Sequence, residues 1–342
     1  MLKQLNKFRH SVFNFRSDVR DDLRELKSAI LELNGRLGGL EAVAANEGLR
    51  AQIGSLQYQL QAAEKRLLLA QGAILKTVNR GSSNLQDSEF RIFSQWGEDG
   101  IINYLVENLD IANHTFIEFG VEDFSEANCR FLLEDRNWSG FVIDGSPENI
   151  GRLNSWGESW KYSLQAHCAF ITRENIASLL AESGFDTDVG ILSIDIDGVD
   201  YWVAAELKKT WRPRILIMEY NAVFGRDRAI TVPYSDNFQR TVAHHSNLYW
   251  GASLKALVHL AASWGYALVG TNNAGNNAFF VRRDLLNNRV FERSLEETFT
   301  DSKYRESRDE TGRLNFLSGS DRVREIAGLP VINVETGGLE AL

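Results

Sequence analysis

The carboxylates best suited to chemistry lie at the ends of two apolar runs near the middle of the chain. The run Ile191–Ile196 contains Asp195 and is followed at once by Asp197, and the next apolar run ends in Glu219 and Asn221. Such runs are typical of buried parallel strands, whose carboxyl ends form the edge where open α/β sheets bind ligands. Oxygen donors from two adjacent strands could hold a divalent cation such as Mg²⁺. The alternative is that they orient a ligand by hydrogen bonds without a metal.

Two earlier apolar runs also end in groups that could contact a ligand. Glu118 and Gly120 end the run 114–120, where a glycine lets the backbone approach a ligand beside the next helix. Asp144 ends the run 140–144, at the position of an acid that accepts hydrogen bonds from ribose hydroxyls. The alternative for Asp144 is that it caps the helix that follows.

From residue 85 onward, short apolar runs alternate with helical stretches, which predicts a doubly wound α/β sheet. We expect five parallel strands at 114–120, 140–144, 162–170, 191–196 and 215–221, with helices between them. Two further strands, 266–270 and 277–281, are joined by a connection too short for a parallel crossover. They must therefore form a terminal antiparallel hairpin.

Four segments of this region carry a family resemblance: 94–102 (SQWGEDGII), 117–120 (IEFG), 141–146 (FVIDGS) and 193–200 (SIDIDGVD). Together they resemble the FkbM-type group of S-adenosylmethionine-dependent methyltransferases, over about residues 90–285. The resemblance implies a Rossmann-like class I methyltransferase sheet and S-adenosylmethionine as the cofactor. It implies that Glu118 and Gly120 line the amino-acid end of the cofactor and that Asp144 binds its ribose.

The same resemblance implies further cofactor contacts from Asp195 and from an upstream helix that carries Gln95, Glu98 and Asp99. One departure concerns the loop after the first strand. The family commonly continues this loop with another glycine, whereas here Val121–Phe124 places a bulky residue there. The shape of the loop and the affinity for the cofactor could therefore differ from those of the family.

A hydroxyl acceptor must lose its proton during methyl transfer, which is otherwise an in-line displacement that needs proximity and alignment. One solution is a cation held by the oxygen donors Asp195, Asp197, Glu219 and Asn221 at the two strand ends. The cation would lower the pKa of a bound hydroxyl. Such a site resembles the metal site of catechol-type O-methyltransferases. The other is a histidine base, supplied by His244 or His245. Adjacent residues of a helix point to different faces, so at most one of the two histidines is expected to act as the base. The catalytic candidates are therefore Asp197, His244 and His245.

The first 80 residues contain no proline and predict a long helix. Apolar residues follow a 4-3 spacing over Val19–Leu40 and again over Leu49–Ile74, which predicts a parallel coiled coil and a homo-oligomer. The alternative is a helix that folds back on the globular domain. Within 3–20, an apolar face surrounded by basic residues could contact an anionic membrane surface, unless it is an ordinary solvated start of the helix.

Composition narrows the function further. We expect a basic N-terminal segment and coiled coil over 1–80, a methyltransferase domain over 85–295 and a charged extension over 296–342. The formal net charge is −9 and falls on the part after residue 80, which argues against nucleic acid as a partner. The two cysteines, Cys129 and Cys168, have no metal-site spacing and fit a reducing compartment.

These observations lead to an expected O-methyltransferase that uses S-adenosylmethionine and acts on a sugar hydroxyl of a surface polysaccharide or other glycan. The glycan follows from the resemblance alone. We expect the protein in the cytoplasm, with a peripheral location at the inner face of the cell membrane as the alternative. Two other functions stay open: a coiled-coil scaffold with a vestigial methyltransferase fold, and O-methylation of a small natural product.

Overall fold

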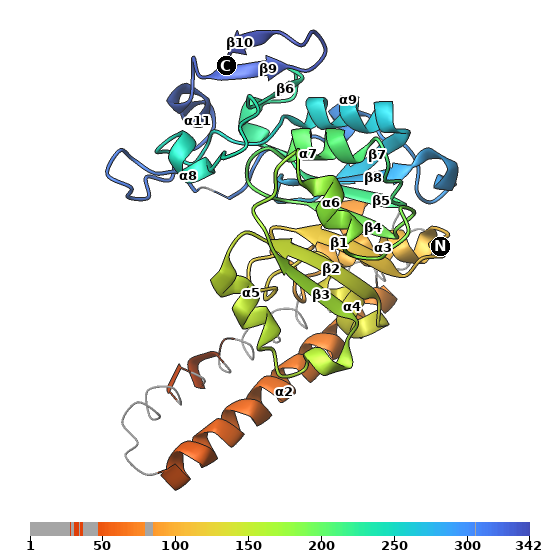
Figure 1. Ribbon diagram of the computed structural model, residues 1–342, viewed down its shortest axis with the longest axis vertical. Helices are drawn as coiled ribbons and strands as arrows, with labels where there is room; N and C mark the ends of the chain where they lie inside the picture. Colours follow the sequence, from red (N-terminus) through yellow and green to blue (C-terminus); the bar gives the residue numbers. More distant parts are fainter. Residues whose placement is uncertain (1–27, 29–30, 34, 37–46, 79–84, 305) are drawn as a thin grey trace, which may run out of the picture. The chain divides into compact units, whose positions relative to one another are not determined.

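The computed structural model describes residues 28, 31–33, 35–36, 47–78, 85–304 and 306–342 (Figure 1). The chain divides into two compact units, Met1–Gly81 and Ser82–Leu342. In the part of the chain that the structure describes, no helix has the length and hydropathy of a membrane span.

The first unit contains the helix α2 (Glu47–Val78), which confirms the helix predicted for the second half of the 4-3 pattern. Along that pattern Ile53 is buried, whereas Leu56 and Ile74 are 52% and 45% exposed. Most of Val19–Leu40 and the basic segment 3–20 lie outside the described residues. Self-association through a coiled coil and contact with a membrane therefore stay predictions.

A seven-stranded sheet forms the centre of the second unit, with the strand order β3-β2-β1-β4-β5-β8-β7. Its first five strands are parallel, and β8 is antiparallel to both β5 and β7. The strands are β1 (Thr115–Phe119), β2 (Ser139–Asp144), β3 (Leu164–Cys168), β4 (Ile191–Ile194), β5 (Ile215–Glu219), β7 (Tyr266–Thr271) and β8 (Asn277–Arg282). The five parallel strands and the terminal hairpin were both predicted, and both are confirmed.

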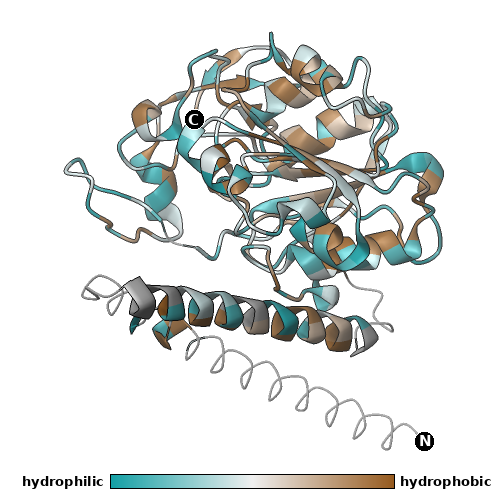
Figure 2. Cartoon of the chain, turned by 60° about the horizontal axis from the view of Figure 1, so that its bottom comes forward, coloured by the Kyte–Doolittle hydropathy of each residue, from teal (hydrophilic) through white to brown (hydrophobic). Residues whose placement is uncertain are grey.

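Helices cover both faces of this sheet because successive strand residues alternate between two apolar cores. Ile117 and Leu192 belong to the core formed with α6, α7 and α9, whereas Phe116 and Ile191 belong to the core formed with α3 and α4. Figure 2 shows the apolar residues concentrated in the strands and on the inner sides of these helices. The helices are α3 (Glu98–Asn108), α4 (Arg130–Arg136), α5 (Pro147–Asn154), α6 (Ile176–Ala181), α7 (Asp200–Leu207) and α9 (Leu254–Trp264).

Helix α4 occupies only the end of the connection between β1 and β2. It begins at Arg130, and Glu122 and Phe124 before it have positive φ angles of 49° and 64°. The preceding segment does not become helical because the backbone N–H groups of Asn128 and Cys129 are hydrogen bonded to a side chain of β1, described below. The helix expected between the second and third strands is confirmed as α5, with the Ser146 hydroxyl as its N-terminal cap.

A second sheet, which the sequence did not predict, brings the total to ten strands among the described residues. It consists of β6 (Ile230–Thr231), β9 (Pro330–Asn333) and β10 (Leu339–Ala341), in the order β10-β9-β6. The segment 296–342, expected as a charged extension, therefore pairs with the insertion that follows β5 and lies within the same compact unit. The short helices α8 (Arg240–Ala243), α10 (Leu295–Thr298) and α11 (Ser320–Glu325) belong to these two segments and their connection.

Candidate functional site

A cavity of about 1010 Å³ lies at the carboxyl edge of the parallel strands. The loops after β1 and β4 and the end of β5 line it together with the hairpin between β7 and β8, the α8 region, Tyr304 and residues from 306–312. A second cavity of about 230 Å³ adjoins it, because Gly120, Asp195 and Asp197 line both. Asp144, at the end of β2, lines the smaller one. The expected edge of the sheet is therefore a continuous crevice.

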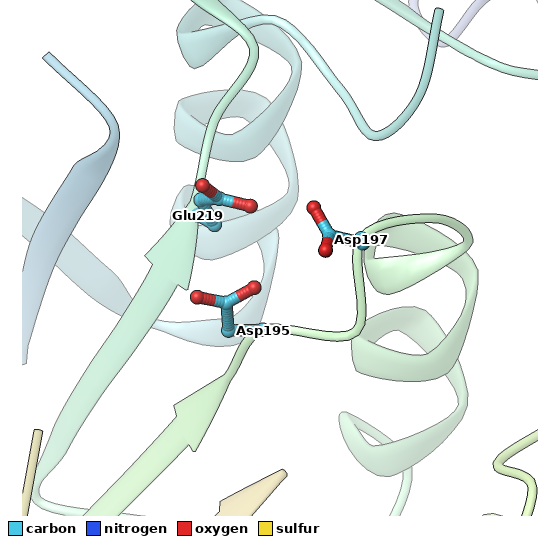
Figure 3. A group of neighbouring side chains, drawn as sticks. All are labelled: Asp195, Asp197 and Glu219. Atoms are coloured by element: carbon cyan, nitrogen blue, oxygen red, sulfur yellow. The ribbon is translucent and has the colours of Figure 1, made fainter. Parts of the chain in front are cut away.

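Three carboxylates converge in the larger cavity, as Figure 3 shows. Asp195 and Asp197 follow β4, Glu219 ends β5, and each offers one oxygen within 4.8 Å of the others. Glu219 is 7% exposed, and its Oε2 has no hydrogen-bond partner. Burial, together with repulsion between neighbouring carboxylates, raises the pKa values of Asp195 and Glu219 well above their ordinary range.

A fourth acid of the same motif, Asp200, has a structural role. Its carboxylate accepts hydrogen bonds from the backbone N–H groups of Ile196 (2.8 Å) and Gly198 (2.9 Å). These bonds hold the turn between β4 and α7, in which Asp197 has a positive φ of 53°. Such a backbone conformation is unfavourable for a residue with a side chain, and the turn directs Asp197 toward the other two acids.

Arg240, which sequence reasoning missed, makes an ion pair with Asp197. Its Nη1 lies 2.5 Å from Asp197 Oδ1, and its other terminal nitrogen bonds to Glu306. The guanidinium also lies 5.7 Å from the ring centroid of Trp250. Arg240 therefore connects the β4 turn to the C-terminal segment across the cavity. The sequence gave no indication of these ion pairs, because Arg240 is a single arginine within a long insertion.

Glu118 organises the loop after β1. It is 3% exposed, and it accepts hydrogen bonds from the backbone N–H groups of Asn128 (2.7 Å) and Cys129 (3.0 Å). Burial raises its pKa to about 7, against the opposing effect of these bonds. Glu118 also lines the larger cavity, so it both positions the loop and borders the crevice.

Gly120 has a φ of +68°, and a Cβ at this position would lie 1.7 Å from the carbonyl oxygen of Asp195. The β1 loop and the β4 turn are thus in direct backbone contact, which only glycine permits.

Asp144 is hydrogen bonded within the protein and also borders the crevice. Its Oδ1 accepts a hydrogen bond from the backbone N–H of Ser146 (2.8 Å), and its Oδ2 accepts one from that of Glu122 (2.8 Å). It therefore holds the start of α5 and the β1 loop, and it also lines the smaller cavity. Phe124 is 1% exposed and packs into the core, so the bulky residue in the β1 loop points away from the crevice.

The three residues expected from the upstream helix divide into two groups. Gln95 lines the larger cavity. Glu98 and Asp99 are buried and accept hydrogen bonds from the protein itself: Glu98 from the side chains of Asn272 and Asn277, and Asp99 from three backbone N–H groups over residues 92–94. These acids hold the loop that carries Gln95, and Glu98 is not a cavity residue.

Asn221 does not join the three carboxylates, contrary to its expected place in a metal site. Its amide nitrogen donates to the carbonyl oxygens of Leu248 (2.9 Å) and Trp250 (3.0 Å), and its Oδ1 accepts from the backbone N–H of Val223 (3.0 Å). The amide thereby caps the 3₁₀ helix η3 (Ala222–Phe224). Its oxygen is engaged within the protein.

The two histidines follow α8 rather than lying within a helix, and their rings are 4.3 Å apart. His245 lines the larger cavity and pairs with Glu325 at 2.9 Å. His244 bonds to the Ser246 hydroxyl at 2.8 Å, and burial lowers its pKa. Of the two predicted bases, only His245 faces the crevice.

Acidic residues dominate the larger cavity. Among the described residues that line it, nine are Asp or Glu and two are Arg, and one of these arginines, Arg240, is already paired with two carboxylates. A cavity of this charge favours a ligand that carries positive charge.

Comparison with known proteins does not assign a family. No family model matches the chain, and no curated protein matches it. Among solved structures, a S-adenosylmethionine-dependent methyltransferase from Clostridium acetobutylicum matches 54% of this chain and 89% of its own at 9% identity, with a TM-score of 0.35. The PH0226 protein from Pyrococcus horikoshii matches 53% of this chain and 85% of its own (13% identity, TM-score 0.33). A putative sarcosine dimethylglycine methyltransferase from Galdieria sulphuraria matches 45% of this chain and 53% of its own, at 13% identity and with a TM-score of 0.31. Only about half of that protein is therefore covered.

The contact between the β1 loop and the β4 turn predicts that Gly120→Ala destabilises the protein by more than the positive φ of this residue alone would cause. Gly265 is the control, because it has a left-handed conformation (φ +93°) but no atom would lie within 4 Å of an added Cβ. We expect Gly265→Ala to lower the free energy of unfolding by about 1 kcal/mol, and Gly120→Ala to lower it by a further 1–3 kcal/mol or so because the backbone must shift. Urea denaturation measures both, and equal losses would contradict the close contact.

Proposed function

We propose that this protein is a methyltransferase that uses S-adenosylmethionine and methylates a hydroxyl group. The observation that carries the proposal is the shape and charge of the crevice. Its smaller cavity has an apolar part formed by Phe170, Ile171 and Val199, next to Asp144. Its larger cavity is acidic. These parts suit a planar base, a ribose and a group that carries sulfonium and ammonium charges, in that order.

The topology of the sheet supports the same placement of S-adenosylmethionine in the crevice. The chain leaves β1 in one direction to form β2 and β3 and returns on the other side to form β4 and β5, so the strand order reverses between β1 and β4. Ligands of open α/β sheets bind outside the carboxyl ends of the strands at such a point. Gly120 and Asp195 lie there and touch through their backbones.

Three residues of the crevice would have distinct parts in the reaction. S-adenosylmethionine supplies an electrophilic methyl group, which the acceptor oxygen attacks while the carbon–sulfur bond breaks. Asp144 would accept hydrogen bonds from the ribose hydroxyls, and Glu118 would face the ammonium group. His245 would receive the hydroxyl proton, because it lines the cavity and imidazole is the most frequent general base in enzymes.

The acceptor that we propose is a sugar hydroxyl of a glycan. Trp96 and Tyr304 both line the larger cavity, and their rings stack with centroids 6.1 Å apart. Trp96 is 39% exposed, so an aromatic surface faces the opening, and the apolar face of a sugar ring can pack on such a surface.

Binding of the cofactor tests the proposal directly. Isothermal titration of the full chain with S-adenosylmethionine should show one site, and Asp144→Ala should weaken it by about 10- to 100-fold, as expected for hydrogen bonds to a charged group. Asp227→Ala is the control, because this acid is exposed and lies outside both cavities. Melting curves would show that each variant is folded. Absence of binding by the unaltered protein would overturn the proposal.

The raised pKa of Glu118 predicts a pH dependence of this binding. With a pKa of about 7, the carboxyl is mostly charged at about pH 7.5 and mostly neutral at about pH 6, so it loses its attraction for the ammonium group as the pH falls. We expect the affinity for S-adenosylmethionine to decrease several-fold over this interval. Titrations across this pH interval, repeated with Glu118→Gln, measure the effect. An unchanged slope in the variant would show that another group is responsible.

A further inference from the structure

Two strands that pair at the carboxyl edge each carry a buried oxygen without a partner. Glu219 ends β5, Asn277 begins β8, and the two residues lie directly opposite each other in the antiparallel pairing. Glu219 Oε2 and Asn277 Oδ1 are both buried without a hydrogen-bond partner, and both residues line the larger cavity. Opposite residues of an antiparallel pair place their Cβ atoms about 4.5–5.5 Å apart on the same face, so the two side chains leave the sheet side by side.

The neighbouring contacts of the two side chains explain why these particular oxygens are left over. Asn277 uses its amide nitrogen to donate to Glu98 Oε1 (3.0 Å), which leaves Oδ1 without a partner. Glu219 receives a long hydrogen bond from Asn276 at Oε1 (3.4 Å), which leaves Oε2. Buried acceptors without partners are unfavourable. A bound group that satisfies both at once would remove this cost.

We propose that Asp195, Glu219 and Asn277 hold a divalent cation, with Asp197 as a further ligand. The donors are two buried or half-buried carboxylates and one amide, all through oxygen, which is the set that Mg²⁺ or Mn²⁺ prefers. A dication also offsets the repulsion between the carboxylates that Figure 3 shows together. The amide ligand differs from the one that the sequence suggested, because Asn221 is occupied elsewhere and the amide oxygen of Asn277 is not.

The proposed site also accounts for the position of Arg240. In the structure, Arg240 neutralises Asp197, so this guanidinium and a cation compete for one carboxylate. A cation at the site would therefore loosen the link between the β4 turn and Glu306. Under the proposed function, it would bind neighbouring hydroxyls of the acceptor sugar, and this part of the inference rests on that function.

Binding of Mn²⁺ alone tests the site independently of any activity. Electron paramagnetic resonance of the full chain, titrated with Mn²⁺ and without S-adenosylmethionine, should show one bound ion. Glu219→Gln keeps the shape of the side chain and should weaken the binding by at least about tenfold. Asn277→Ala should also weaken it, whereas Asn221→Ala should leave it unchanged, and this pair of variants distinguishes the two possible amide ligands. Circular dichroism at the titration temperature selects variants that are folded.

The outcomes separate this inference from the proposed function. Bound Mn²⁺ that depends on Glu219 and Asn277 supports the site even if S-adenosylmethionine does not bind. The absence of bound Mn²⁺, or binding that survives Glu219→Gln, overturns the site and leaves the methyltransferase proposal standing. Loss of Mn²⁺ in Asn221→Ala, with Asn277→Ala unaffected, would overturn the assignment of Asn277.

Discussion

The burial of several carboxylates at one edge of a parallel sheet is the constraint on which the rest of this structure depends. Removing a carboxylate from water is costly unless hydrogen bonds or opposite charges compensate. Most of the buried acids receive that compensation from backbone N–H groups: Asp99 from the loop before α3, Glu118 from the loop before α4, and Asp200 from the β4 turn. These bonds fix the loops, and the loops define the crevice.

The distribution of hydrogen bonds separates structural acids from those available to a ligand. Asp99, Asp200 and Glu98 face the protein and hold its backbone. Glu219 keeps a free buried oxygen, as does Asn277 opposite it. The cavity that these two residues line has an excess of negative charge, which a cationic cofactor and a metal ion would both reduce. One electrostatic imbalance thus supports both the proposed function and the cation site.

Most of the sheet could be predicted from the sequence because all its strands except the edge strand β3 are largely buried and appear as apolar runs. The hairpin followed from the short connection between its strands. The second sheet was missed because its strands are short and partly exposed: β10 has only three residues, and Leu339 in it is 69% exposed. Apolar periodicity gives no signal for such elements.

The site was only partly predictable, since residue type and strand position do not determine where a side chain points. The convergence of Asp195, Asp197 and Glu219 followed from the parallel register of β4 and β5. The sequence could not show which of Asn221 and Asn277 has an amide oxygen available to a ligand, because this depends on the 3₁₀ turn that directs Asn221 toward Trp250. The ion pair between Arg240 and Asp197 joins residues 43 positions apart and leaves no local pattern.

The most direct test of the account is a crystal structure with S-adenosylhomocysteine, the product that remains after methyl transfer. The account predicts the ribose hydroxyls within hydrogen-bond distance of Asp144, the adenine beside Phe170, and the sulfur on the side of Asp195 and Asp197. A ligand bound in the opposite direction, with its adenine among the three carboxylates, or bound outside this crevice, would contradict it.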